Sequence, residues 1–258
     1  MSDSPEYRER KAFFDRVLTV YGRKPVLEVL QNPQLHCHAL HLAQSNREQG
    51  LVRDIRALAE SRDIPVNTHS REALARISRN GRQDQGVAVD VLCPAFRQFT
   101  DALPDLPPRA RLLALDGITN PQNLGMIIRS AAAGEIDGIL YARGGNAALG
   151  PLVIKASAGT LYRAPLLLCD SLPGALRLCR ERQMEVCALA ADATQTLFEF
   201  NPDGGCVYVL GNETEGVSPG ALKEATRGLA IPMRNGVESL NVAVTASLIA
   251  YAGLMRPT

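Results

Sequence analysis

The stretch Val207–Met255 reads VYVLGNETEGVSPGALKEATRGLAIPMRNGVESLNVAVTASLIAYAGLM and decides the fold of the second half of the chain. An apolar run ends in a glycine-rich turn, a second short run ends in Ile231-Pro232-Met233, and an apolar helix follows. Buried parallel strands have near-continuous apolar runs, and glycine lets a backbone approach a ligand closely. This order predicts a small-molecule site at the carboxyl ends of sheet strands.

Apolar runs alternate with amphipathic segments upstream of this stretch. Residues 112–116, 138–142 and 186–191 are typical of buried strands, whereas residues 123–133 and 171–183 have the spacing of helices. Such alternation predicts an α/β domain with a mostly parallel sheet that helices cover on both faces.

The rest of the chain divides by composition into four parts. Residues 1–20 are charged at their start and are predicted to form an N-terminal tail, and short strands and helices alternate over residues 21–92, as in a small α/β domain. Residues 93–110 contain four prolines, which stop helices and stiffen a connection, so we predict a linker there. Residues 111–258 then form the second, larger domain.

Composition limits the classes of function. The net charge of the 258 residues is +1, so no global field attracts the protein to nucleic acid. The N-terminus has no apolar signal segment and the apolar helix near 241–255 is too short to span a bilayer, which predicts a cytoplasmic protein without membrane contact. The six cysteines form no CxxC pair, which favours buried free thiols in a reducing compartment. The four histidines lie far from the glycine-rich segments in sequence, so we expect no metal site.

A first motif, Asn120-Pro121-Gln122-Asn123-Leu124-Gly125, precedes Arg129 by a short helical spacing. A functional interpretation places Arg129 at a phosphate or ribose beside a catalytic centre. The alternative is a helix cap together with a structural ion pair of the arginine, and spacing alone favours this alternative.

Two further motifs follow apolar runs. Leu210-Gly211-Asn212-Glu213 continues to Gly216, and its simpler interpretation is a strand-to-helix turn capped by Ser218. That turn does not explain why Glu213 stands at the end of a buried strand. In the third motif, Ser239 or Asn241 is suited to cap the apolar helix, which is also consistent with an ordinary core helix.

Together, NPQNLGMIIRSA (120–131), LGNETEGVS (210–218) and IPMRNGVESLNVAVTAS (231–247) resemble, in order and spacing, the three signature motifs of the SpoU/TrmH family of RNA ribose methyltransferases, in the SPOUT superfamily. YGRKPVLEVL (21–30) and DQGVAV (84–89) look like parts of the family's N-terminal substrate-binding domain. Two departures are mild: Asn120 stands where aspartate is usual, and Glu135 where an apolar residue is usual.

The resemblance implies a fold and an activity that periodicity does not show. It implies an α/β trefoil knot in the C-terminal domain, S-adenosyl-L-methionine as the cofactor, and a homodimer with its sites near the subunit interface. The reaction would methylate a ribose 2′-hydroxyl of RNA, most simply ribosomal RNA. Alternatives are the same chemistry on transfer RNA, an antibiotic-resistance methyltransferase, and a non-catalytic RNA-binding assembly factor.

The resemblance also assigns residues by motif position. The catalytic set it implies is Asn123, Arg129, Glu213, Ser239 and Asn241. The cofactor-binding set is Leu210, Gly211, Asn212, Gly216, Ile231, Met233, Ser239 and Leu240. We expect Asn123 and Glu213 to orient Arg129, which the family uses as a base, although an arginine keeps its proton and is better suited to clamp a phosphate or stabilise an oxyanion.

The RNA contacts are expected in the first domain. Arg76, Arg79 and Arg82 lie in RISRNGRQDQG, just before the last predicted strand of that domain. Three arginines so close together would neutralise RNA phosphates and make affinity depend on salt. The sequence supports equally well the alternative that these arginines are only solvated surface charges.

Overall fold

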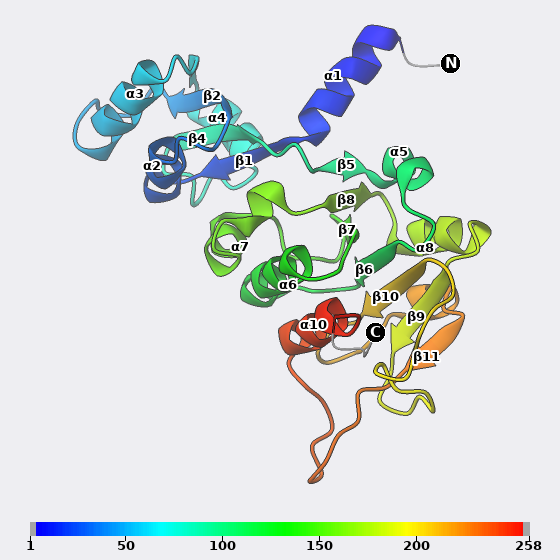
Figure 1. The fold of residues 1–258 in the computed structure, drawn as a ribbon. Coiled ribbons are helices and arrows are strands. Elements are labelled where there is room, and N and C mark those ends of the chain that lie inside the picture. The colour runs from blue at the N-terminus through cyan, green and yellow to red at the C-terminus, as the bar shows by residue number, and fades with distance from the viewer. Residues whose placement is uncertain (1–3, 255–258) are drawn as a thin grey trace. The chain divides into compact units, whose positions relative to one another are not determined.

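The structure is a computed structural model that describes residues 4–254. It divides into two compact units, with the chain up to Pro94 and residues 149–151 in the first and the remainder in the second (Figure 1), and each is described separately below. No helix in the described part of the chain is long and apolar enough to cross a membrane.

The first unit is built on a four-stranded mixed sheet with the order β1-β4-β2-β3. Strand β4 runs antiparallel to both β1 and β2, while β3 runs parallel to β2. The strands are β1 (Val17–Tyr21), β2 (Cys37–Ala43), β3 (Val66–His69) and β4 (Val87–Leu92). The helices are α1 (Pro5–Asp15), α2 (Arg23–Gln31), α3 (Leu51–Ser61) and α4 (Arg71–Ser78).

The predicted N-terminal tail contains regular secondary structure. Residues 5–15 form α1, which Ser4 caps by accepting a hydrogen bond from Tyr7 N, and residues 17–20 belong to β1. Strand β1 was not predicted. Its two pairs of apolar residues are interrupted by Thr19 and charged residues precede them, so the sequence shows no continuous apolar run there; in the structure its burial alternates. Residues 1–3 of the predicted tail lie outside the described residues.

A line of hydrogen-bonded polar side chains crosses all four strands of this sheet. Thr19 Oγ1 donates to Asp90 Oδ1 at 2.6 Å, and His41 Nε2 donates to Asp90 Oδ2 at 3.1 Å. The other ring nitrogen of His41 lies 3.0 Å from His69 Nε2. Burial opposes the charge of Asp90, but the hydrogen bonds from His41 and Thr19 outweigh it and lower the pKa of Asp90. Burial and the neighbouring His41 lower the pKa of His69.

These two shifts predict that acid destabilises the first unit in two steps. The unfolded chain protonates His69 below about pH 6.5 and Asp90 below about pH 3.9, in each case before the folded unit does. Stability is therefore lost as the pH falls through each window. Asp90→Asn should remove the lower window and cost about 1–3 kcal/mol at pH 7, because two donors lose a charged acceptor. Hydrogen exchange of residues 17–21 and 87–92 between pH 7.5 and 3 measures this; an unchanged pH profile in Asp90→Asn would contradict it.

The second unit contains a seven-stranded sheet with the order β11-β9-β10-β6-β7-β8-β5, and every named pair is parallel. The strands are β5 (Arg97–Gln98), β6 (Arg111–Leu115), β7 (Gly138–Ala142), β8 (Leu166–Cys169), β9 (Glu185–Leu189), β10 (Cys206–Leu210) and β11 (Arg227–Leu229). Strands β7 and β10 are buried at every position and β6 at every position after Arg111, which explains their apolar runs.

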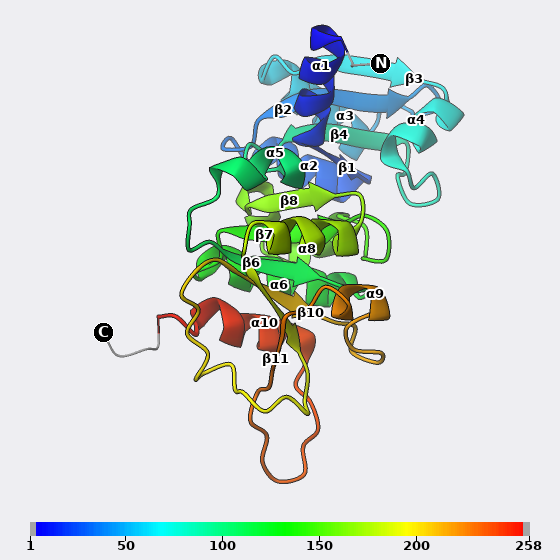
Figure 2. The ribbon, with the colours of Figure 1, turned by 90° about the vertical axis from the view of Figure 1, so that its right-hand side faces the viewer.

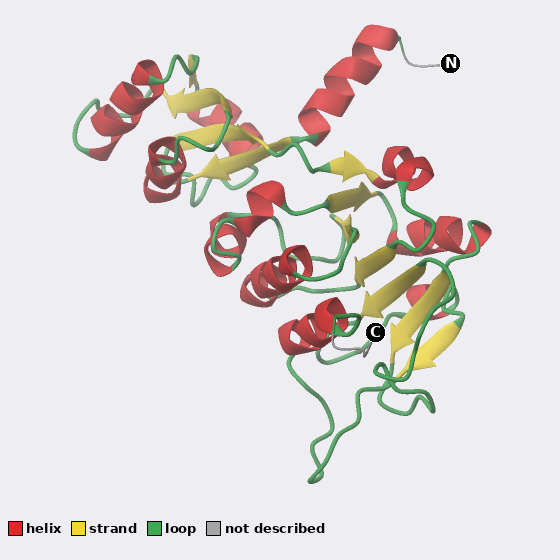
Figure 3. Ribbon diagram, in the orientation of Figure 1, coloured by secondary structure: helices red, strands yellow, loops and turns green. Residues whose placement is uncertain are grey.

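Helices cover both faces of this sheet, as predicted. Figure 1 shows α6, α7 and α10 on one side and α5 and α8 on the other, and Figure 3 shows the sheet between these layers. The helices are α5 (Phe99–Ala102), α6 (Pro121–Ala133), α7 (Pro151–Ala156), α8 (Leu172–Glu181), α9 (Pro219–Leu222) and α10 (Val242–Tyr251), with 3-10 turns η1 (Leu103–Asp105) and η2 (Thr160–Arg163).

The proline-rich segment 93–110 has more regular structure than a linker. Strand β5 in this segment pairs with β8, and α5 and η1 follow it directly. Phe99 and Leu103 are buried in the core on that face of the second sheet. Most of the segment is thus part of the second unit.

The strand order defines a switch point in the second sheet. From β6 the chain builds outward through β7 and β8, and then returns to place β9 and β10 on the opposite side of β6. The carboxyl ends of β6 and β10 lie together, and Asp116 N donates to Leu210 O at 2.9 Å. Loops leaving such neighbouring strands turn in opposite directions and leave a crevice, so this is the expected place for a ligand.

All six cysteines lie in the described part of the chain and none forms a disulfide; four are buried as predicted, whereas Cys37 and Cys169 are half-buried. Burial raises the pKa of Cys93 and of Cys179 to about 12 in each case. Thiols of this kind are unreactive at neutral pH and fill the core.

Candidate active site

The loop after β6 leads into α6 through an asparagine cap. Asn120 Oδ1 accepts hydrogen bonds from Gln122 N at 2.8 Å and from Asn123 N at 3.4 Å, and Pro121 occupies the first helical position. The helix thus begins two residues earlier than predicted, because proline fits that position. As a result, Asn123 lies inside the first turn, where it is buried.

The loop after β10 is a tight turn that requires its glycines. Asn212 and Gly216 exchange two backbone hydrogen bonds of 2.9 Å. The φ of Gly216 is +71°, a conformation that favours glycine, and a Cβ on Gly211 would lie 2.1 Å from the carbonyl carbon of Gly216. The side chain of Asn212 ties this loop to the previous one by donating to Gly117 O at 2.8 Å.

Asn123 links the three predicted motifs. Its side-chain Nδ2 donates a hydrogen bond to Glu213 Oε1, in the loop after β10. Its Oδ1 accepts one of 3.2 Å from Nδ2 of Asn241, whose own Oδ1 caps α10 by accepting from Ala243 N at 2.8 Å. A buried amide is costly unless it is paired, and here both of its ends are paired. The chain Glu213–Asn123–Asn241 therefore fixes α6 to two segments that lie 90 and 118 residues further along the sequence.

A shallow pocket lies beside this chain of hydrogen bonds. Backbone and side chains from the loops after β6 and β10 form most of its wall, and α10 contributes one residue. The lining residues are Gly117, Ile118, Thr119, Asn120, Asn123, Asn212, Glu213 and Val242. The pocket thus opens at the switch point that the strand order defines.

Arg129 does not join this group within one chain. Asn123 and Arg129 are six residues apart on α6, which separates them by about 120° around the helix and about 9 Å along it. The side chain of Arg129 is exposed and makes no hydrogen bond or ion pair with residues 4–254. The carboxylate of Glu213 instead accepts from Asn123. The expectation that Asn123 and Glu213 orient Arg129 is therefore not met inside one subunit.

Of the predicted catalytic and cofactor-binding residues, only Asn123, Asn212 and Glu213 line the pocket, and the other nine lie outside its wall. Ile231, Met233, Ser239 and Leu240 belong to the loop between β11 and α10, which reaches away from the sheet in Figures 1 and 3. Ser239 and Leu240 are exposed, whereas Ile231 and Met233 are half-buried. Leu210, at the end of β10, is fully buried.

Sequence reasoning missed two side chains that shape the site. Asp116 Oδ2 accepts a hydrogen bond of 2.6 Å from Ser218 N and so joins the loops after β6 and β10. Asn146 Oδ1 accepts from Ile118 N at 2.7 Å, while its Nδ2 donates to Leu115 O and Ala142 O. An acidic residue directly after a buried strand was a usable signal for Asp116. No local pattern marks Asn146, whose partners come from two strands.

The three predicted RNA-contact residues lie on the surface of the first unit. Arg76 is in the last turn of α4, so only Arg79 and Arg82 are in the loop. All three side chains are exposed. Arg79 ends α4 with φ +53°.

Two family matches cover most of the chain. Residues 110–251 match the SpoU rRNA Methylase family, and residues 19–92 match the domain described as RNA 2′-O ribose methyltransferase substrate binding. The chain belongs to the SpoU rRNA methylase family. It is an RNA 2′-O-ribose methyltransferase, and S-adenosyl-L-methionine is its methyl donor.

Relatives and solved structures agree with this family. An uncharacterized tRNA/rRNA methyltransferase of Mycolicibacterium smegmatis is 32% identical over 93% of this chain and 76% of its own. The 23S rRNA (guanosine-2′-O-)-methyltransferase RlmB of Salmonella typhimurium is 27% identical over 93% and 98%. A TrmH-family RNA methyltransferase structure from Porphyromonas gingivalis, described as putative, is 25% identical over 96% and 92%, with a TM-score of 0.61. The AviRb structure from Streptomyces viridochromogenes has the same fold, with a TM-score of 0.62, 20% identity, and coverage of 97% and 93%.

The loops after β10 and β11 fit the methyl donor. A Cβ on Gly216 would meet no atom within 4 Å, so the backbone there is open to a ligand. The side chains of Val237 and Leu240, in the loop after β11, are 51% and 37% exposed and offer apolar surface. An adenosine group needs both kinds of surface.

Proposed function

We propose that the chain methylates a ribose 2′-hydroxyl of ribosomal RNA at the pocket beside Asn123. The observation that carries this proposal is the hydrogen-bonded chain Glu213–Asn123–Asn241, which joins the three motifs at the switch point. The relative from Salmonella typhimurium, named as a 23S rRNA methyltransferase and matched over 98% of its length, supports ribosomal RNA as the substrate. The proposal implies a cytoplasmic location, where that RNA is processed.

In this proposal Asn123, Glu213 and Asn241 hold the target ribose. Because its own amide is fixed at both ends, Asn123 presents one geometry to the substrate, and fixed geometry is a main source of rate in a transfer between two bound groups. Leu210, Gly211, Asn212 and Gly216 would hold the cofactor through their backbone, and Ile231, Met233, Ser239 and Leu240 would complete its site from the loop before α10. The bound cofactor supplies a methyl group on a positively charged sulfur, which is already activated, so the proposal includes no metal ion.

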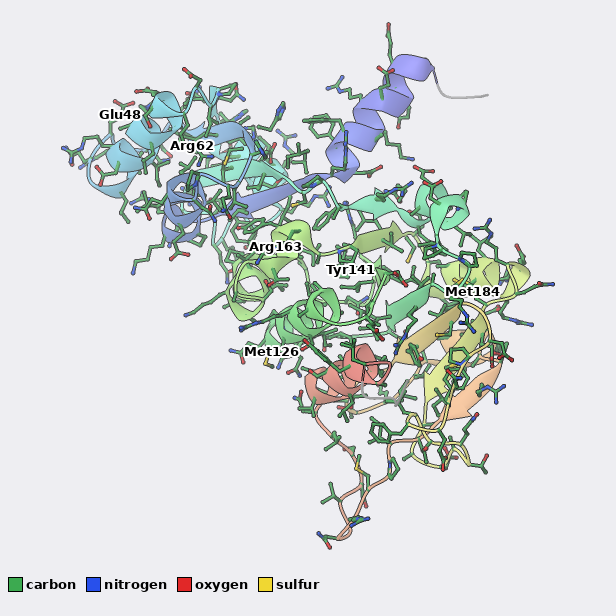
Figure 4. The ribbon with its side chains drawn as sticks, viewed as in Figure 1. Glu48, Arg62, Met126, Tyr141, Arg163 and Met184 are labelled. Carbon is green, nitrogen blue, oxygen red and sulfur yellow. The ribbon has the colours of Figure 1, made fainter. Side chains whose placement is uncertain are left out.

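We further propose that Arg129 acts across a homodimer interface. It is exposed and unpaired among the described residues, and it lies about 120° around α6 from its own Asn123, with which it makes no hydrogen bond. Large apolar side chains on α6 and α10 are also exposed: Met126 at 41%, Val244 at 47% and Tyr251 at 38%, with Met126 labelled in Figure 4. Exposed apolar surface of this kind is typical of a subunit interface.

Arg129 of the partner subunit would then approach the pocket. An arginine keeps its proton at working pH, so its role in the proposal is to bind the phosphate beside the target ribose and stabilise negative charge on the hydroxyl oxygen. The C-terminal segment 231–254 would pass through the loops around β10 to form the trefoil knot of the family. That arrangement would bring the loop before α10 to the cofactor.

A transfer assay tests the proposed substrate. The protein is incubated with S-adenosyl-L-methionine labelled in its methyl group and, in separate reactions, unmodified ribosomal RNA transcripts and transfer RNA. We expect label in one ribosomal transcript, at a single ribose identified by nuclease digestion and mass spectrometry. Label in transfer RNA alone would move the substrate to that class. Cofactor binding without transfer to either RNA would favour a non-catalytic assembly factor, and protection of ribosomes from an antibiotic would indicate a resistance enzyme.

A further inference from the structure

We propose that the first unit grips RNA through one edge of its sheet, called here the loop edge, formed by residues 22–24, 44–49 and 79–86. This inference rests on the proposed function and assigns its RNA-contacting surface. Strands β1, β2 and β3 all end at this edge and β4 begins there, because β4 alone runs antiparallel to β1 and β2. The topology therefore brings together three loops that are distant in sequence.

Hydrogen bonds around Arg23 fasten the three loops to one another. The backbone N of Arg23 donates to Gln85 Oε1 at 3.1 Å, and its guanidinium donates to Gln85 O and to Asn46 Oδ1, each at 3.4 Å. Asn46 Nδ2 in turn donates to Gly86 O at 2.6 Å. A Cβ on Gly86 would lie 2.8 Å from Asn46 Oδ1, so the contact requires glycine at that position. The loop edge is thus a preformed surface rather than three independent loops.

A buried carboxylate holds the longest of these loops from within. Asp84 is 2% exposed, and it accepts hydrogen bonds from Ser78 Oγ at 2.8 Å and Gly86 N at 2.9 Å. Asn80 Nδ2 donates to Tyr21 OH at 3.0 Å and ties the same loop to the end of β1. The negative charge of Asp84 therefore faces inward, and the arginines of the loop face outward.

Among the described residues of the first unit, the arginine ion pairs are made by Arg53 and Arg56, outside the loop edge, while Arg10 and Arg71, also outside it, make none. Away from the edge, Arg53 pairs with Asp54 at 3.4 Å. Glu48, next to Arg47 in sequence, forms an ion pair with Arg56 at 2.9 Å rather than with Arg47. Among the described residues, no ion pair is made by the exposed edge cations Lys24, Arg47, Arg79 and Arg82.

Unpaired cations are what a polyanion requires. Each of these side chains neutralises an RNA phosphate without first breaking an ion pair. Helix α2 begins at the same edge after Gly22, with neither a side-chain cap nor an acidic residue in its first turn, so the positive end of its dipole adds to the field. Exposed amides of Gln83 and Gln85 stand among the cations and suit ribose hydroxyls and base edges of folded RNA. The loop edge thus includes Arg79 and Arg82 and extends the contact to Lys24, in the first turn of α2, and to Arg47, in the loop after β2.

The test compares two double variants of the full-length protein with the same loss of charge. Arg47→Gln/Arg82→Gln removes two edge cations, and Arg10→Gln/Arg53→Gln removes two exposed arginines outside the edge. Affinity for unmodified ribosomal RNA transcripts is measured by filter binding from 50 to 300 mM salt, without cofactor. The edge variant should bind at least about tenfold more weakly, with a salt slope smaller by roughly 1.5, while the control stays within about twofold of wild type. Circular dichroism checks that both variants are folded.

The outcomes test the RNA-binding role of the loop edge separately from the methyl-transfer activity. Equal affinities and salt slopes for the two double variants would overturn the loop edge, even if the wild type methylates RNA. Absence of methyl transfer by the wild type would overturn the proposed function, whereas the binding comparison would still report on the loop edge. If transfer occurs, the edge variant should raise the KM for RNA and leave kcat within about twofold, because the lost contacts are equally strong in the ground and transition states.

Discussion

Gly211→Ala is expected to abolish methyl transfer and to weaken binding of S-adenosyl-L-methionine by at least about tenfold. The added Cβ would lie 2.1 Å from the carbonyl carbon of Gly216 and 2.2 Å from Val217 N. Both obstacles are backbone atoms, so no side chain can rotate away, and the loop itself must move. That movement would break the two hydrogen bonds between Asn212 and Gly216 and shift Glu213, which lies between them.

Titration calorimetry with the cofactor and the labelled-methyl assay measure both effects. Gly204→Ala is the matched control, because a Cβ there meets no atom within 4 Å and the residue lies outside the pocket. We expect the control to behave as the wild type. The unfolding free energy should fall by only about 1–3 kcal/mol in Gly211→Ala, the usual cost of local overpacking, so the chain should remain folded. Normal cofactor affinity in Gly211→Ala would show that this turn is not part of the cofactor site.

The architecture of the second unit was largely predictable, because a parallel sheet covered on both faces leaves a strong pattern in the sequence. Strands β7 and β10 are buried at every position, and β6 at every position after Arg111, so they appear as apolar runs. The short strand β5, with one exposed residue, has no such run. Its position depends on pairing with β8, a contact nearly seventy residues away in sequence, and no local pattern records it.

Of the polar residues that the motifs singled out, Asn123, Glu213 and Asn241 meet in the structure, whereas Arg129 does not join them within one chain. Asn123, Glu213 and Asn241 meet because the strand order places β10 beside β6, and this order cannot be read from the strands themselves. The separation of Arg129 from Asn123, in contrast, follows from six residues at about 100° each and could have been predicted from the helix alone. The position of the loop before α10 could not be predicted from the sequence, because the loop is almost entirely exposed and burial does not fix its position.

Arg129→Ala and Asn123→Ala are each expected to lower kcat by at least about a hundredfold, the range seen when one fixed transition-state contact is removed. Cofactor affinity should stay within a few-fold in both variants. For Arg129 this follows because the side chain is exposed and away from its own pocket, so its removal should not disturb the second unit. An equal loss of cofactor affinity and of transfer in Arg129→Ala would indicate a structural role instead.

Mixing the two inactive variants tells which subunit supplies Arg129. If the arginine acts across the interface, a mixed dimer contains one complete site, with Asn123 from one subunit and Arg129 from the other. Random mixing makes half of the dimers mixed, so activity should recover to about a quarter of the wild-type value. If the arginine acts within its own subunit, every site in the mixture lacks one residue and no activity returns.

The double variant Asn123→Ala/Arg129→Ala is the matched control, because mixing it with wild type should reduce activity where mixing the two single variants restores it. Mixed with wild type, it should inactivate both sites of every mixed dimer if the sites are shared, so activity falls as the square of the wild-type fraction. With sites contained in single subunits, the fall is linear. A squared fall together with recovery in the first mixture would require Arg129 and Asn123 to meet only between subunits. The exposed side chain of Arg129 from one subunit and the buried, doubly paired amide of Asn123 from the other would then form one site.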